Sequence, residues 1–146
     1  MEEVFYKYID EVIQNGNNLK YEWRENNTEI LFQKISSQGF DIIIRYDENN
    51  IYLETDTGYH DYFKVNNNFK EVLIDVMGII RDLLTRNMRI KEYLSNNRSY
   101  KWTLQCFREN KWKDESSTGL IFWNYFGKKS EKIYFNNSLP IRELNK

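Results

Sequence analysis

The sequence predicts an α+β fold in which an antiparallel sheet of about six or seven strands carries two helices on one face. Apolar residues recur with helical spacing in 2–15 and 68–94, and they alternate with polar residues in most other segments. Short clusters of Asn, Asp, Ser and Gly separate these segments at intervals of about ten residues. The expected order is one helix, four strands, a second helix and three strands, all within a single domain spanning 1–146.

The first helix is expected over 2–15, where Phe5, Ile9 and Val12 fall on one face. Gly16 follows between two asparagines and can adopt the left-handed conformation that ends a helix. Four strands should come next, at 19–25, 29–35, 40–46 and 50–55. Paired asparagines lie between several of these strands, and Asn tolerates the positive φ that tight turns require.

The second helix is expected over 68–94, because a broad apolar stripe runs from Phe69 to Met88. Asn68 can cap its N-terminus, with Glu71 three residues later as in a capping box. Three further strands are expected at 100–108, 119–126 and 132–135.

The bulk composition excludes several classes of function. The 21 Lys and Arg nearly balance the 22 Asp and Glu, so the net charge of -1 argues against a nucleic-acid or membrane-surface protein. No apolar run approaches the roughly 18 residues of a membrane span, and the start of the chain is acidic, unlike an export signal. A cytoplasmic location is therefore expected. With Cys106 and His60 the only residues of their kinds, we expect no metal and no cofactor.

The segment 54–63 is the one most typical of a catalytic site. It holds His60 with Asp56 and Asp61, which could act as an acid–base group and its orienting carboxylate, as in a small hydrolase or nuclease. The favoured interpretation is a polar turn whose carboxylates bond backbone N–H groups, because the spacing matches no known metal loop.

Aromatic and basic residues alternate in 98–102 and again around Trp112. Trp102 and Trp112 could stack the bases of a single-stranded nucleic acid. Asp114 and Glu115 follow at once, however, and no nucleic-acid motif is present, so this alternative is disfavoured.

The segment 120–126 is apolar or aromatic at nearly every position. If it is a strand, Trp123 and Tyr125 share one face, which is either core or a protein contact surface. Trp112, Tyr52 and Tyr134 are plausible neighbours on an open sheet face, rimmed by the acidic loop. The predicted protein-binding residues are therefore Tyr52, Asp56, Tyr59, His60, Asp61, Trp112, Trp123 and Tyr125.

The chain resembles immunity proteins of bacterial polymorphic and contact-dependent toxin systems in the order of its elements and in two stretches of sequence. These stretches are 83–92, with the downstream Tyr100-Lys101-Trp102, and 119–128. The resemblance implies a non-enzymatic cytoplasmic protein that binds and neutralises one cognate toxin. It supplies no catalytic residues. A secretion-type chaperone or adaptor and a hydrolase using His60 remain as alternatives.

Overall fold

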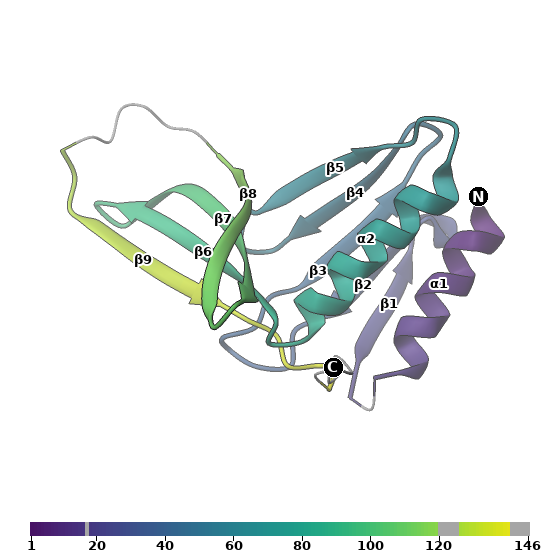
Figure 1. The fold of residues 1–146 in the computed structure, drawn as a ribbon, viewed down its shortest axis with the longest axis horizontal. Helices are drawn as coiled ribbons and strands as arrows, with labels where there is room; N and C mark the ends of the chain where they lie inside the picture. The colour runs from purple at the N-terminus through teal and green to yellow at the C-terminus, as the bar shows by residue number, and fades with distance from the viewer. Residues whose placement is uncertain (17, 120–125, 141–146) are drawn as a thin grey trace.

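The computed structural model describes residues 1–16, 18–119 and 126–140, and within them the fold is α+β with two helices and two antiparallel sheets (Figure 1). The five-stranded sheet is a meander in the order β1-β2-β3-β4-β5, and the four-stranded sheet has the order β8-β7-β6-β9. The elements are α1 (Glu2–Gln14), β1 (Lys20–Arg24), the 3-10 turn η1 (Glu25–Asn27), β2 (Glu29–Gln33), β3 (Ile42–Tyr46), β4 (Asn50–Thr55), β5 (His60–Lys64), α2 (Phe69–Leu84), β6 (Met88–Ser95), β7 (Arg98–Arg108), β8 (Lys111–Thr118) and β9 (Lys129–Tyr134).

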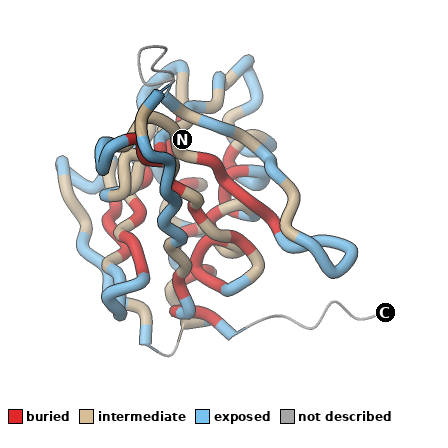
Figure 2. The backbone as a smooth tube through the Cα atoms, turned by 90° about the vertical axis from the view of Figure 1, so that its left-hand side faces the viewer, coloured by how far each residue is buried: buried red, intermediate tan, exposed pale blue. Residues whose placement is uncertain are grey.

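The main core lies between the two helices and the inner face of the five-stranded sheet. Both helices cover the same face of that sheet, as predicted, and the four-stranded sheet lies beside it (Figure 1). Buried stretches run through the interior while the turns are exposed (Figure 2). The helices contribute Phe5, Ile9, Val12, Leu73, Val76, Met77 and Ile80, and the sheet contributes Ile30, Phe32, Ile42, Ile44, Ile51 and Leu53.

The first half of the chain follows the prediction closely. The first helix and the first four strands fall within the expected segments, and Asn68 caps α2 through its side chain, which accepts a hydrogen bond from the Glu71 N–H at 3.3 Å. Asparagines in the turns take positive φ at Asn26 and Asn27, and again at Asn96 and Asn97. The asparagine pairs therefore mark turns, as the pattern indicated.

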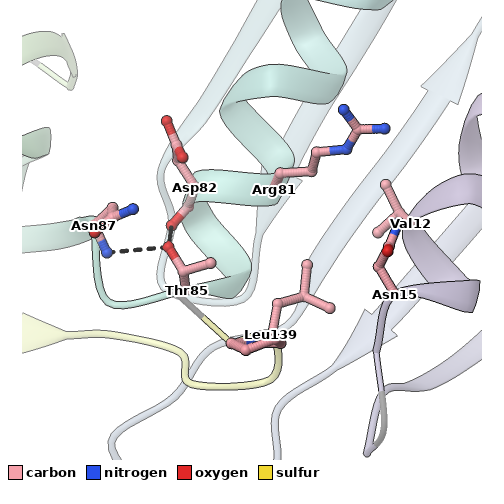
Figure 3. Close-up of a pocket in the computed structure, with 8 residues that line it drawn as sticks. Val12, Asn15, Arg81, Asp82, Thr85, Asn87 and Leu139 are labelled. Carbon is pink, nitrogen blue, oxygen red and sulfur yellow. Dashed lines mark hydrogen bonds between the residues drawn. The ribbon is translucent and has the colours of Figure 1, made fainter. Parts of the chain in front are cut away.

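The second helix is shorter than predicted, because residues 85–94 do not continue it. Thr85 is extended, and its hydroxyl donates to the Asp82 carbonyl at 2.9 Å and accepts from the Asn87 N–H at 3.1 Å (Figure 3). These bonds end α2, and β6 begins at Met88. The apolar residues of this stretch, such as Met88 and Ile90, alternate with polar ones and fit a strand as well as a helix.

The prediction of one sheet was also wrong in its strand count and order. The segment around His60 is strand β5 rather than a loop, and β8 was not predicted at all. Both strands are polar and lie at sheet edges, so they lack the apolar alternation that reveals a half-buried strand. The strand expected at 119–126 falls mostly on 120–125, outside the described residues.

Trp102 of β7 lies where the two sheets meet. A Cβ on Gly58, in the β4–β5 turn, would lie 2.6 Å from the Trp102 ring, and one on Gly119 would lie 3.1 Å from it. Both glycines also have positive φ, which side chains disfavour. Glycine is therefore suited to these positions both by the lack of space for a Cβ and by the backbone conformation. Next to them, the Tyr59 hydroxyl bonds the Ser116 hydroxyl at 2.5 Å, and the Thr118 hydroxyl donates to the His60 carbonyl at 2.7 Å.

After β9 the chain returns as a strap that ties the two sheets and α2 together. Asn136 is buried, and its side chain accepts from the Phe40 N–H at 3.1 Å and donates to the Phe40 carbonyl at 3.0 Å. The N–H groups of Ser138 and Leu139 both donate to the Leu84 carbonyl, at 2.8 and 3.0 Å. The strap therefore satisfies a carbonyl at the end of α2, where no intrahelical partner exists.

Asn136→Ala should lower the free energy of unfolding by about 2–4 kcal/mol, because it leaves a buried N–H and a buried carbonyl of Phe40 without their partner. Urea unfolding measures the change. The matched control is Asn137→Ala, since Asn137 is adjacent and exposed, and it should stay within about 0.5 kcal/mol of wild type. Equal losses in the two variants would show that the strap contributes nothing through Asn136.

Candidate protein-binding surface

The outer face of the four-stranded sheet, which points away from the core, carries an unusual set of side chains. We call it the basic aromatic face. Strand register places on it Arg89, Lys91, Tyr93, Ser95, Arg98, Lys101, Thr103, Gln105, Phe107, Trp112, Asp114, Ser117, Lys129, Glu131 and Ile133. Five of these are cationic and two are acidic, so the face has a formal charge of +3 in a chain whose total is -1.

Arg89 and Trp112 form the first cluster on this face. The Arg89 guanidinium carbon lies 4.0 Å from the centre of the Trp112 ring, a cation–π arrangement. Phe107 contacts the same ring, with centroids 5.2 Å apart, and remains 46% exposed. The cluster therefore presents aromatic surface whose rings are already held in place.

Arg89 is also fixed by a polar relay across three strands. Its Nε donates to Gln105 Oε1 at 2.8 Å, and Gln105 Nε2 donates to Asp114 Oδ1 at 2.8 Å. Burial lowers the pKa of Arg89 from its ordinary value, since the charge is partly removed from water. Among the residues that the structure describes, no carboxylate forms an ion pair with Arg89.

A second cluster surrounds Tyr93 at the other end of the face. The Lys91 and Lys101 ammonium groups lie 5.0 and 5.1 Å from the centre of its ring. A register shift in the β6–β7 pairing next to Tyr93 brings Tyr100 within 6.2 Å of it, and Lys129 lies over the Tyr100 ring at 4.9 Å. Cations on aromatic rings thus recur along the whole face.

The outer face of the five-stranded sheet differs in how its charges are compensated. There Arg45 pairs with Glu54 at 2.6 Å, and Arg24 pairs with Glu22 at 3.0 Å. Hydrogen bonding to Glu54 raises the pKa of Arg45, the opposite direction from Arg89. The two arginines of this face are therefore neutralised by carboxylates of the same face, as expected of a solvated surface.

The structure does not gather the predicted binding residues into one surface. Register places Tyr52 and His60 on the outer face of the five-stranded sheet, whereas Trp112 lies on the basic aromatic face. Thr118, which contacts the His60 backbone, is six residues along β8 from Trp112, or about 20 Å at the rise of a strand. Trp123 and Tyr125 lie outside the described residues.

The acidic residues near His60 hold the turn together. Asp56 accepts from the Asp41 N–H at 2.9 Å and from the Lys34 ammonium at 2.7 Å, which agrees with the favoured interpretation of this segment. Asp61 accepts from the Tyr62 N–H at 2.8 Å and lies on the inner side of β5. Because neighbouring residues of a strand point to opposite faces, His60 and Asp61 point apart, and the sequence could not show this while the segment was expected to be a loop.

Tyr59 is 1% exposed, so its ring belongs to the core rather than to a contact surface, contrary to its place among the predicted binding residues. Its position follows from the alternation of β5, which turns the residue before His60 inward at the joint between the sheets. Burial raises the pKa of Tyr59 to about 12.

Two cavities offer alternative sites away from the basic aromatic face. One, of about 240 Å³, lies between the C-terminal ends of the two helices and is lined by Val12, Arg81, Asp82 and Leu139 among others (Figure 3). The other, of about 330 Å³, is polar and includes the buried Glu92, which accepts from the Tyr134 hydroxyl at 2.7 Å. Within the described ranges, no three His, Cys, Asp or Glu side chains gather closely enough to hold a metal ion.

Of the residues on the basic aromatic face, Trp112 was singled out from the sequence, whereas Arg89, Tyr93 and Phe107 were not. Arg89 and Tyr93 fell in the predicted helix, where their common face was hidden. The available signal was the alternation of Arg89, Lys91 and Tyr93 with the buried Met88, Ile90, Glu92 and Leu94.

Comparisons of the chain with protein-family models, with curated proteins and with solved structures find no match. Among the described residues, no helix is long and apolar enough to cross a membrane.

The raised pKa of Tyr59 predicts a loss of stability in alkali. The folded state keeps the phenol proton between pH 10 and about 12, where the unfolded state, with a pKa of about 10, releases it. On this account, Tyr59 adds no pH dependence below pH 10. Above it, Tyr59 should lower the free energy of unfolding by about 2–3 kcal/mol as the pH approaches 12.

Urea unfolding at a series of pH values measures this slope in wild type and in Tyr59→Phe. The variant loses the bond to Ser116, so it should start less stable, but its stability should fall less steeply above pH 10. Parallel slopes in the two proteins would show that Tyr59 ionises as freely in the folded state as in the unfolded one.

Proposed function

We propose that this chain is a non-catalytic protein-binding module of the cytoplasm, and specifically an immunity protein that binds and neutralises a cognate bacterial toxin. The single observation that carries the proposal is the basic aromatic face, where cations lie over aromatic rings along the length of a sheet. The resemblance of 83–92 and 119–128 to immunity proteins points the same way.

The composition of this face suits a protein contact. Trp, Tyr and Arg are the residues enriched at the energetic centres of protein interfaces. Phe107 and Ile133 add apolar surface and are 46% and 41% exposed. Because Arg89 is held by both Trp112 and Gln105, fewer rotamers would be lost on binding than for free side chains.

A binding role also agrees with the state of the residues considered for catalysis. His60 is exposed, and its Nδ1 lies 3.2 Å from the Gly58 carbonyl. Asp56 and Asp61 are occupied by backbone N–H groups. An acid–base pair needs the base within hydrogen-bond reach of its orienting carboxylate, and no such bond to His60 is formed among the residues described.

The proposal is tested with the product of the reading frame immediately upstream in the host genome. That product should be toxic when expressed alone in a bacterium, and co-expression of this chain should restore growth. Trp112→Ala should weaken the complex by about 30-fold, the effect of removing a residue at the centre of an interface. Titration calorimetry of the purified pair measures the affinity.

Tyr62→Ala is the matched control, because Tyr62 is an aromatic residue that is 57% exposed on the other sheet. It should leave both binding and growth unchanged. The proposal is wrong if the wild-type chain neither binds the product nor restores growth, and the assignment of the surface is wrong if Tyr62→Ala weakens binding more than Trp112→Ala does.

A further inference from the structure

We infer that the partner of the basic aromatic face is an acidic protein surface, whose carboxylates pair with Arg89 and Lys101. This inference rests on the proposed function and adds the chemistry of the partner. It begins with the uneven distribution of charge. The face carries +3, so the rest of the chain carries -4, and the near-neutral total conceals a dipolar molecule.

The cations of the face differ in how they are compensated. Lys91 forms an ion pair with Glu131 at 3.0 Å. Arg89 and Lys101 form no ion pair with any carboxylate in the described part of the chain. Both instead contact aromatic rings, Trp112 and Tyr93 respectively. Arg89 and Lys101 are therefore cations of this face that are held against aromatic rings and still have charge to offer a partner.

The stacking of Arg89 favours a carboxylate partner. A guanidinium that lies over a ring keeps its N–H groups directed outward in its own plane, where they can bind a carboxylate by two parallel hydrogen bonds. The Nε of Arg89 is already bonded to Gln105, which leaves the terminal nitrogens for this purpose. The cost of partly burying the Arg89 charge is thus already met in the free protein, which is what lowers its pKa.

The same geometry argues against single-stranded nucleic acid on this face. Base stacking needs an open aromatic surface, but Arg89 covers one side of the Trp112 ring at 4.0 Å. Trp102, the other tryptophan considered for stacking, packs at the joint between the sheets, with its Nε1 buried. Neither tryptophan therefore offers a nucleic acid a fully open ring on which to stack a base.

The test uses a short poly-L-glutamate peptide as the probe, with poly-L-lysine and an oligo-dT as the comparison ligands. Poly-L-glutamate should bind wild type, and Arg89→Gln should weaken that binding by about tenfold. The binding should also fall as ionic strength rises from about 0.01 M to about 0.15 M, over which the Debye length shortens from about 30 Å to about 8 Å.

Arg45→Gln is the matched control, since Arg45 also lies over an aromatic ring, Tyr52, at 4.6 Å, but is paired with Glu54. It should leave the affinity for poly-L-glutamate unchanged. Carbodiimide coupling of the bound probe, followed by peptide mapping, should modify Lys101 in preference to Lys20 and Lys64 on the other sheet.

Three results would overturn the inference: equal effects of Arg89→Gln and Arg45→Gln, coupling spread evenly over both sheets, or tighter binding of oligo-dT than of poly-L-glutamate. Its failure can be told apart from failure of the proposed function. If the toxin binds and Arg89→Gln binds it as well as wild type, the proposed function stands and the acidic partner does not. If poly-L-glutamate binds as expected but no toxin is neutralised, the preference of the face for an acidic partner stands and the proposed function does not.

Discussion

The arrangement of this molecule depends on the point where α2 stops. At Thr85 the hydroxyl bonds both the last turn of α2 and the chain that follows, so the backbone leaves the layer of helices and starts a second sheet. The returning strap bonds the Leu84 carbonyl, and Asn136 bonds Phe40 on the far side. These contacts join α2, the five-stranded sheet and the strap that leaves β9. They direct one face of the four-stranded sheet toward the core and the other outward.

The sequence predicted the first half of the fold because its signals there agree. Helical spacing, asparagine turns and alternating strands all indicate the same elements from α1 to β4. The second half of the fold was harder to predict from the sequence, for two physical reasons. Apolar residues around Met88 and Ile90 satisfy both a helical and an alternating pattern, and the polar edge strands β5 and β8 satisfy neither. Whether the nine strands of the described residues form one sheet or two is decided by contacts between distant residues, such as Trp102 against Gly58, which no local pattern reveals.

The candidate surface was also predictable only in part, because it too depends on contacts between residues that are distant in the chain. Trp112 could be singled out as an aromatic residue beyond the needs of a one-sided core. Its partner Arg89 could not, because it is 23 residues away in the chain and its strand had been assigned to a helix. The net charge of -1 argues against a nucleic-acid or membrane partner, yet it is the sum of a basic sheet face and an acidic remainder. A total charge constrains the partner only when the charges are evenly spread.

The proposed docking surface is tested most directly by NMR, with the chain isotopically labelled and the product of the upstream reading frame added as the proposed partner. The indole N–H signal of Trp112 and the amide signals of Arg89, Lys101 and Phe107 should shift on binding. Signals from Tyr52 and Tyr62 on the other sheet should stay in place. Shifts confined to Tyr52 and Tyr62, with Trp112 and Arg89 unmoved, would contradict the central claim that the outer face of the four-stranded sheet is the docking surface.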